Sequence, residues 1–345
     1  IFNGRLYLVG GLDGTGNTDS VSRTILNSDG SINAWKTQTM SGLGMNSVSY
    51  LYSFARANPT ATSTVPGNLY VLGGCSATSA MGCTAYSQNV YKCDIQVSGV
   101  IAGCSTSGQL QIGIIPGDSA TGLGIMSGTV YANYVYLIGG VSPNQQDLTT
   151  VRYAKIDDNN NIVTTGSGWV ESGKTMEVGR RRAAAFGYNG YIYVVGGYDA
   201  GTGVLADIEF VKVNVSDGSL GSATDGFHVS AVNINRRWGL SLPISNSFAY
   251  AIGGCTSGNS PTCNSGGPTD NIQTFQVYNN DSGAPAGYST AANTYTTDAN
   301  RVGASAAVYN GKLYVAGGCT SATDCTTASN NVSYATIDSY GNLGS

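Results

Sequence analysis

The most regular pattern in the sequence is a short apolar run that contains a tyrosine and ends in two glycines. It reads LYLVGG, LYVLGG, VYLIGG, IYVVGG, AYAIGG and LYVAGG, with the paired glycines at 10–11, 73–74, 139–140, 196–197, 253–254 and 317–318. Successive runs therefore follow one another at a nearly constant spacing, with a period of roughly 57–66 residues. A period of this size indicates a repeat protein in which every unit contributes one supersecondary element.

The polar positions around each run predict four strands per unit, which we call a, b, c and d. In the fourth unit they are expected over 180–187, 191–197, 208–213 and from 219 onward. Asn189–Gly190 separates a from b, and Asp217–Gly218 separates c from d. Both dipeptides favour hairpin turns, because both central residues of a type I′ turn need a positive φ. The continuous apolar character of strand b predicts that both of its faces are covered.

Six such units predict an all-β fold, a six-bladed β-propeller of four-stranded antiparallel blades that forms a single domain over residues 1–345. Blades stacked around an axis cover both faces of strand b. The units resemble kelch repeats in the Gly-Gly that ends strand b, the aromatic residue that opens strand d (Trp35 and Trp169) and the Arg before strand a. This resemblance covers nearly the whole chain and implies the fold, without an activity. The units exceed the kelch period of about 50 residues, so enlarged loops are expected.

The first unit begins in mid-repeat, because IFNGRLY at 1–7 aligns with YNGYIY at 188–193 and YNGKLY at 309–314. Most of its strand a is therefore missing, and Ser345 ends the sequence one residue before the aromatic residue expected to open strand d of unit six. We expect the sequence to be a segment of a longer chain in which flanking residues complete the ring. A neighbouring chain that covers the open edge is the alternative, because unpaired strand edges invite association.

Composition narrows the range of partners. Charged residues make up 10% of the chain, against about a quarter in an average soluble domain. The formal net charge is −4 and the sequence has no basic cluster, which argues against nucleic acid as a partner because its binding depends on neutralisation of phosphates by Lys and Arg. No apolar run approaches the roughly 18 residues of a membrane span, so direct membrane insertion is not expected.

The eight cysteines form four close pairs, namely Cys75 and Cys83, Cys93 and Cys104, Cys255 and Cys263, and Cys319 and Cys325. In three pairs the first cysteine directly follows the Gly-Gly, so the pair brackets a b–c loop. Cys93 and Cys104 instead flank the hairpin centred on Ser98–Gly99, where residues that face each other across two strands come close to disulfide geometry. Metal binding is the alternative, but no Cys-x-x-Cys pair occurs and a zinc site needs four converging ligands. Four disulfides are predicted, which places the protein in the extracellular space or at the cell surface.

The lengths of the connections distinguish the two faces of the expected disc. The a–b and c–d connections are mostly tight. The b–c and d–a connections share the opposite face, and the longest b–c loops span 75–88, 255–271 and 319–331. Long loops on a rigid scaffold are a usual place for binding, and disulfides across them suggest a preorganised surface. Protection of the loops from proteolysis is the alternative explanation for these disulfides.

The candidate binding residues are arginines and tyrosines expected on this loop face. Arg180, Arg237 and Arg301 precede the strand-b tyrosine of their units by the same spacing, while Arg56 lies one position off this register relative to Tyr70. An arginine ring at the channel mouth can hold a carboxylate or sulfate bidentately, or it can satisfy backbone carbonyls between blades. Further candidates outside this period are Arg181, Arg182, Arg236, Tyr86 and Tyr198, the two tyrosines as residues that stack on sugars.

These features favour a non-catalytic extracellular binding or adhesion module that recognises a glycan or a surface protein, with no cofactor and no metal. Kelch-like galactose oxidases bind copper with two histidines, and this chain has only His228. A sialidase-like glycoside hydrolase is one alternative, although sialidases pair three arginines with a Tyr–Glu couple and glutamates are scarce here (Glu171, Glu177 and Glu209). A structural subunit of an extracellular filament or surface lattice is the other, supported by the open edge of unit one.

Overall fold

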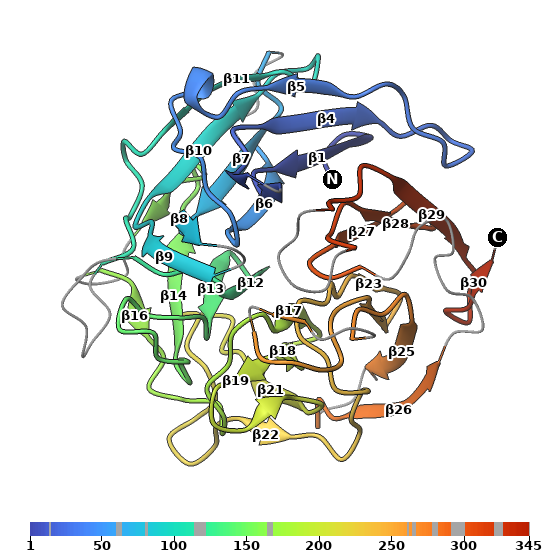
Figure 1. Ribbon diagram of the computed structural model, residues 1–345. Coiled ribbons are helices and arrows are strands. Elements are labelled where there is room, and N and C mark those ends of the chain that lie inside the picture. The colour runs from blue at the N-terminus through green and yellow to red at the C-terminus, as the bar shows by residue number, and fades with distance from the viewer. Residues whose placement is uncertain are drawn as a thin grey trace.

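The protein is an all-β, six-bladed β-propeller, as the six repeats predict (Figure 1). The computed structural model describes residues 1–345 except 14, 60–63, 80–81, 114–121, 164–167, 261, 264–266, 278–281, 291–300, 321–326 and 345. In each blade that contains it, strand a lies nearest the central axis of the propeller, and strand d lies at the outer edge (Figure 1). Within the described residues, the helical structure is confined to one 3-10 turn, η1 (Ser41–Leu43).

The first three blades differ in their number of strands. Blade 1 has three among the described residues, namely β1 (Arg5–Val9), β4 (Val21–Ile25) and β5 (Lys36–Gln38), without a strand a, as predicted. Blade 2 consists of β6 (Tyr52–Ala57), β7 (Gly67–Leu72), β10 (Val90–Ile95) and β11 (Ile101–Ser105). Blade 3 consists of β12 (Ser127–Tyr131), β13 (Tyr134–Ile138) and β14 (Val151–Ile156), with strand d split into β15 (Ile162–Val163) and β16 (Val170–Glu171).

The other three blades are four-stranded. Blade 4 consists of β17 (Ala184–Tyr188), β18 (Tyr191–Val195), β21 (Ile208–Lys212) and β22 (His228–Val229). Blade 5 consists of β23 (Ile244–Ser245), β24 (Phe248–Ile252), β25 (Ile272–Val277) and β26 (Pro285–Thr290). Blade 6 consists of β27 (Ser305–Tyr309), β28 (Lys312–Ala316), β29 (Val332–Ile337) and β30 (Leu343–Gly344).

Two details of the loops complete the architecture. Among the described residues, three b–c loops contain small hairpins, formed by β2 (Leu12–Asp13) with β3 (Gly16–Asn17), β8 (Cys75–Ser79) with β9 (Gly82–Tyr86), and β19 (Tyr198–Asp199) with β20 (Gly203–Val204). The expectation that strand d of unit six begins only beyond Ser345 is wrong. A tight turn, in which the Asp338 N–H donates to the Asn342 carbonyl at 3.0 Å, already brings Leu343 beside Ile337.

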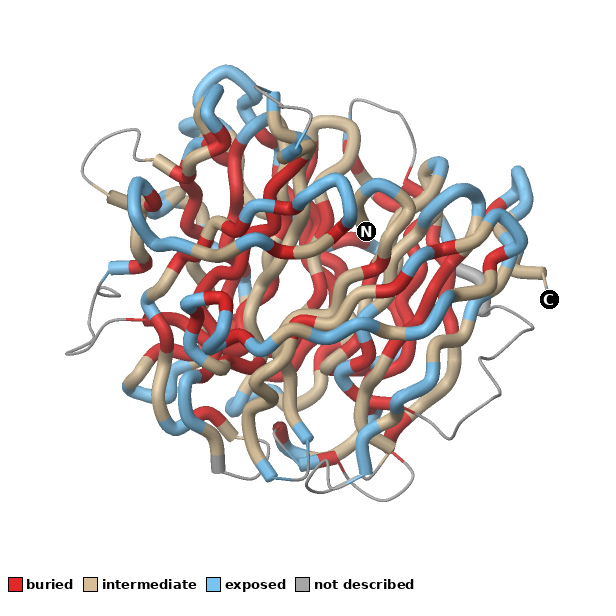
Figure 2. Tube along the Cα trace, turned by 90° about the horizontal axis from the view of Figure 1, so that it is seen from above, coloured by how far each residue is buried: buried red, intermediate tan, exposed pale blue. Residues whose placement is uncertain are grey.

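The apolar core lies between neighbouring blades rather than inside any one of them. Each of the six junctions has its own cluster of buried side chains. Tyr193 and Phe275, for example, join blades 4 and 5, and Leu6 and Tyr314 join blades 1 and 6. All five residues of β13 and of β18 are buried, which confirms that strand b is covered on both faces in blades 3 and 4. In blade 1, four of the five residues of β1 are only half-buried. Figure 2 shows this buried interior, with exposed residues in the turns and loops around it.

The paired glycines are required because consecutive blades approach each other closely at this point. A Cβ on Gly139, in blade 3, would lie 2.4 Å from the carbonyl oxygen of Arg180, in blade 4. The same carbonyl accepts a hydrogen bond from the N–H of Gly140 at 2.9 Å. The φ angles of the two glycines are +57° and +95°, which favour glycine. Equivalent approaches join Gly10–Gly11 to Val48, Gly73–Gly74 to Leu123, and Gly196–Gly197 to Arg237.

In blades 1–5 the tyrosine of the run ties its blade to the next one. The hydroxyl of Tyr193 donates to the carbonyl of Gly283, in the c–d turn of blade 5, at 2.7 Å. The same hydrogen bond runs from Tyr7 to Gly99, from Tyr70 to Asn160, from Tyr136 to Gly218 and from Tyr250 to Gly341. Burial raises the pKa of Tyr250 to about 12 and that of Tyr193 further. These phenols are therefore neutral structural donors.

Candidate functional site

One face of the ring gathers the features that can form a site, and we call it the Gly-Gly face. It consists of the b–c loops, which follow the paired glycines, and of the segments that lead into strand a. In blades 2, 4, 5 and 6 the first residue of the b–c loop pairs with the lead-in of the same blade. These pairs are Cys75 with Ser49, Tyr198 with Arg181, Cys255 with Trp238, and Cys319 with Val302, each joined by two backbone hydrogen bonds of 2.7–3.1 Å.

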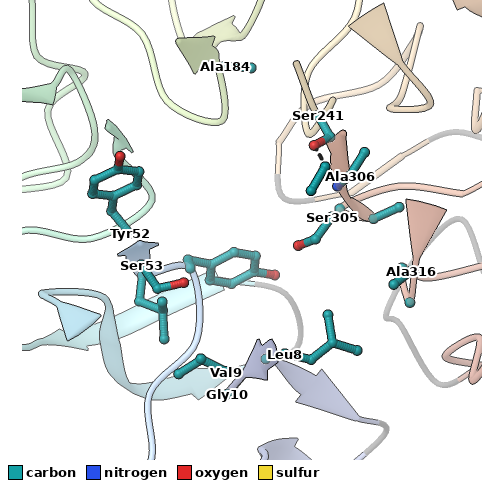
Figure 3. A pocket seen from close by; sticks show the side chains of 18 of the residues that line it. Leu8, Val9, Gly10, Tyr52, Ser53, Ala184, Ser241, Ser305, Ala306 and Ala316 are labelled. Carbon is teal, nitrogen blue, oxygen red and sulfur yellow. Dashed lines mark hydrogen bonds between the residues drawn. The ribbon is translucent and has the colours of Figure 1, made fainter. Parts of the chain in front are cut away.

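A cavity of about 620 Å³ lies at the centre of the ring. Its wall is formed by strand a and its lead-in from blades 2–6 and by β1 from blade 1. Figure 3 shows Ser53 of β6 and Ser305 of β27 with their hydroxyl groups directed into this space from opposite sides. The hydroxyl of Ser241 instead accepts the N–H of Ala306 at 2.8 Å. The wall thus combines apolar surface with a few hydroxyl groups, as ligand-binding pockets commonly do.

Five residues form a hydrogen-bonded circlet around the mouth of this cavity. In blades 2, 3, 4 and 6 these residues lie two positions before strand a, and in blade 5 the residue lies five positions before β23. All five have a positive φ: Tyr50 (+50°), Ile125 (+55°), Arg182 (+54°), Gly239 (+65°) and Gly303 (+70°). From Ile125 onward, the N–H of each member donates to the carbonyl of the preceding one, at 3.2, 3.1, 2.8 and 2.8 Å in chain order. This left-handed conformation costs a residue with a side chain about 1–2 kcal/mol. The circlet therefore keeps three such residues in place through contacts between blades.

Arg182 contributes a positive charge to the rim. Its guanidinium carbon lies 4.4 Å from the ring centroid of Tyr50 and 4.9 Å from that of Trp238, so the cation stacks on two aromatic faces. The side chain is buried and also lines the cavity. The structure thus brings Arg182 to a rim position, whereas Tyr50 and Trp238, its two stacking partners, were not identified from the sequence.

The three periodic arginines are buried inside their own blades. Arg180 donates to the Gly196 carbonyl at 3.1 Å and forms ion pairs with Asp207 (2.8 Å) and Glu209. Burial raises the pKa of Glu209, and the adjacent guanidinium opposes this rise. Arg237 donates to Gly253, Asn271 and Gln273, and Arg301 donates to Gly317 and Asn331. These side chains therefore satisfy backbone carbonyls, as the structural alternative predicts, although within a blade rather than between blades.

Arg181 and Tyr198 lie together but do not form an open sugar platform. Arg181 pairs with Asp147 through two nitrogen atoms, and its guanidinium carbon lies 5.9 Å from the ring centroid of Tyr198. The expectation that Tyr198 is exposed is wrong, because it packs with Trp238 and Cys255 and is 6% exposed. The hydrogen-bonded pairing of Arg181 with Tyr198 draws this loop back onto the ring.

The remaining sequence-predicted residues are dispersed. Tyr86 lies on β9, half-buried, and its hydroxyl accepts a hydrogen bond from Gln145 at 2.6 Å. Arg236 is exposed on the lead-in of blade 5. Arg56 lies on β6 opposite Asn68, and it donates to Asn133 at 2.8 Å. Its expected place on the Gly-Gly face is wrong, because this end of β6 lies beside the a–b turn, at the other face.

The predicted disulfides are confirmed where the structure describes both partners. Bonds join Cys75 to Cys83, Cys93 to Cys104 and Cys255 to Cys263. Cys319 is also a disulfide cysteine, and Cys325, its predicted partner, lies outside the described residues. Cys93 faces Cys104 directly across strands c and d of blade 2, as the hairpin symmetry predicts.

Neither metal-binding nor transmembrane features are found within the described residues. No three side chains of His, Cys, Asp and Glu gather there into a group able to hold a metal ion. His228 lies on β22, the outer strand of blade 4, and its Nε2 contacts Asp225 at 2.7 Å. None of the helical structure described has the length and hydropathy required to cross a membrane.

Comparison with known protein families gives a match in the last repeat. The family model described as Kelch motif matches residues 300–334. This range covers the lead-in, strands a and b, the Gly-Gly and the b–c loop of unit six, and it ends within β29. No curated protein matches the chain.

Proposed function

Since the chain is a kelch-repeat β-propeller, a fold that suggests a protein-binding module, we propose that it is an extracellular, non-catalytic module that binds a surface protein through the Gly-Gly face. A surface glycan is the other ligand class that this face suits. The proposal rests on the way in which the b–c loops are fixed. Loops held rigidly before binding lose little conformational entropy when a partner docks, which increases affinity.

Two independent restraints hold these loops. Cys255 is joined to Cys263 by a disulfide and to the lead-in residue Trp238 by two backbone hydrogen bonds, at 2.8 and 3.0 Å. The same two restraints recur in blade 2, where Cys75 bonds to Cys83 and pairs with Ser49. A repeated double restraint directly after the Gly-Gly supports a preorganised binding surface.

The exposed side chains of these loops are mostly polar and uncharged. They include Thr84, Asn144, Thr202, Thr256, Asn259, Thr262 and Thr327, with Arg236 as an exposed cation. Small polar side chains of this kind provide adaptable hydrogen bonds at binding surfaces. With few charges on the surface, binding should depend only weakly on ionic strength.

The environment of the arginines favours binding over sialidase-like hydrolysis. A hydrolase of that type needs convergent arginines available to a substrate carboxylate. Arg180, Arg237 and Arg301 are each less than 2% exposed and donate to carbonyls of their own blades. Their recurrence along the chain is explained by this structural role.

The test uses the oxidised chain, labelled with biotin, on a glycan array and on intact cells analysed by flow cytometry. We expect binding to cell-surface protein that is lost when Cys255 and Cys263 are both replaced by serine and reduced in Arg236→Ala, which keeps the loop disulfides. Val215→Ser, in a c–d turn on the opposite face and 59% exposed, is the matched control and should bind normally. Binding that survives protease treatment of the cells and appears on the array indicates a glycan. Turnover of a fluorogenic sialoside, or binding lost only in Val215→Ser, overturns the proposal.

A further inference from the structure

Three Asn-x-Ser sequences occur in the chain, and they fall in different structural settings. They begin at Asn214, Asn280 and Asn331. In a secreted protein, a sequence of this kind in a surface turn or loop is an acceptor for an N-linked glycan. Asn280 lies outside the described residues. The structure therefore allows the other two sequences to be compared.

Asn214 opens the c–d turn of blade 4, on the face opposite the Gly-Gly face. The Asn214 N–H donates to the Ser219 carbonyl, and the Asn214 carbonyl accepts the Gly218 N–H, each at 2.8 Å. The hydroxyl of Tyr136, from blade 3, donates to the Gly218 carbonyl at 2.9 Å. The base of this turn is thus fixed to its own blade and to the preceding one.

The tip of the same turn is open to solvent. Residues 214–217 are all exposed, and Val215 is 59% exposed. Blade 3 contacts the tip through a main-chain atom, because the Tyr134 hydroxyl donates to the Ser216 carbonyl at 3.4 Å. A bulky group on the Asn214 side chain can therefore extend into solvent without displacing these contacts.

The side chain of Asn214 is oriented so that its amide nitrogen remains available. Its Oδ1 accepts two hydrogen bonds from Ser216, one from the hydroxyl at 2.8 Å and one from the N–H at 3.3 Å. Its Nδ2 donates no hydrogen bond within the part of the chain that the structure describes. The serine of the sequence thus contacts the amide oxygen and leaves the nitrogen, the atom that a glycan modifies, without a partner.

Asn331 differs both in its local structure and in the face on which it lies. It ends the b–c loop of blade 6, on the Gly-Gly face, and the next two residues belong to β29. Within that strand Ser333 pairs with Val315 of β28. This sequence therefore continues into a paired strand, and a glycan on it would project from the face that we propose for binding.

We propose that Asn214 carries an N-linked glycan, which covers the c–d turn of blade 4 and leaves the Gly-Gly face open for the partner. The donor is a lipid-linked oligosaccharide diphosphate. A bond forms between Asn214 Nδ2 and C1 of the first sugar while the bond between C1 and the phosphate oxygen breaks. The diphosphate leaves with the electron pair of the broken bond, and Nδ2 loses one proton. This inference rests on the extracellular location in the proposed function, because the transfer takes place on chains that enter the secretory pathway.

The test expresses the full chain 1–345 behind a signal peptide in a eukaryotic cell line. An amidase that releases N-linked glycans and converts the modified asparagine to aspartate is applied in ¹⁸O-labelled water, and peptide mass mapping then locates the label. We expect labelling at Asn214 that is lost in Ser216→Ala and kept in Ser216→Thr. Ser219→Ala, which changes a serine of the same turn outside the acceptor sequence, is the matched control and should keep the label.

Both the medium and the cell lysate are mapped, so that a chain retained in the cell is also read. An Asn214 without label in both fractions overturns the proposal, as does labelling confined to Asn331. Equal loss of the label in Ser216→Ala and Ser219→Ala also overturns it, because the hydroxyl of Ser216 would then have no specific role.

Binding to cells separates this inference from the function on which it rests. We expect the glycosylated chain and Ser216→Ala to bind cells equally, because the glycan lies on the face opposite the partner. Stronger binding by Ser216→Ala would mean that the glycan obstructs the partner, which overturns the assignment of an open binding face. A chain that is labelled at Asn214 but binds no cells refutes the binding function and supports the glycan. An unlabelled chain that binds refutes the glycan alone.

Discussion

Replacing Gly139 by alanine tests the explanation of the paired glycines, because the chain offers a control with almost the same backbone conformation. The added Cβ would lie 2.4 Å from the carbonyl oxygen of Arg180 and 3.2 Å from that of Leu148. The Arg180 carbonyl has little freedom to move away, since it also accepts the Gly140 N–H at 2.9 Å and its own side chain is fixed by ion pairs. The substitution must therefore push blades 3 and 4 apart locally or break this hydrogen bond.

The magnitude follows from three contributions. A non-glycine residue at the φ of +57° costs about 1–2 kcal/mol. Overpacking at a close contact costs about 1–3 kcal/mol. A weakened inter-blade hydrogen bond adds about 0.5–1.5 kcal/mol. Gly139→Ala should thus lower the free energy of unfolding by about 2.5–6.5 kcal/mol.

The control is Gly317→Ala, whose φ is +66° but whose Cβ would have no neighbour within 4 Å. Only the conformational cost applies there, so the loss should be about 1–2 kcal/mol. Urea denaturation of the oxidised proteins, followed by far-ultraviolet circular dichroism, measures both values. Losses that are equal in the two variants, within the error of the extrapolation to zero urea, would refute the idea that close approach between blades requires the glycine.

Three other predictions follow from the contacts between blades. Tyr193→Phe removes the hydroxyl that donates to the Gly283 carbonyl at 2.7 Å. Because a buried acceptor loses its partner, the free energy of unfolding measured by thermal denaturation should fall by about 1–3 kcal/mol. An unchanged Tm would contradict this role. Arg182→Ala removes the cation stacked on Trp238 and should cost about 1–2 kcal/mol with a shift in tryptophan emission, whereas an unchanged spectrum would show that the stacking does not persist in solution. Burial raises the pKa of Tyr250 from 10.0 to about 12, so the stability that its neutral phenol contributes is complete below pH 10 and is lost as the pH rises from 10 to 12. Absorbance in the near ultraviolet should show the buried tyrosines ionising only together with unfolding, and their independent ionisation near pH 10 would disprove this.

The fold could be predicted from the sequence because its strongest signals are local and repeated. A run such as IYVVGG at 192–197 specifies a buried strand and a close approach at once, and the cysteines fall at equal positions after three such runs. Counting along the chain fails where connections differ in length. Blade 2 has its a–b connection at 58–66, against 189–190 in blade 4, and this difference places Arg56 at the other face.

The site could be predicted only in part, because much of it is a property of the backbone. The circlet contains Tyr50, Ile125 and Arg182 beside two glycines, so its members share a φ angle but no residue type. Likewise, Tyr198 lies in a polar loop yet is buried, since its loop folds back onto Arg181. Neither fact is encoded in a local motif.

The location of the apolar clusters at the six junctions has a consequence for how the molecule comes apart. A single sheet separated from its two neighbours has almost no apolar side chains that remain buried from water. Loosening one sector thus weakens the sectors on both sides, and disruption should spread around the whole circle. Melting should accordingly occur as one event, and a species that has lost one sector while five stay intact has no thermodynamic basis.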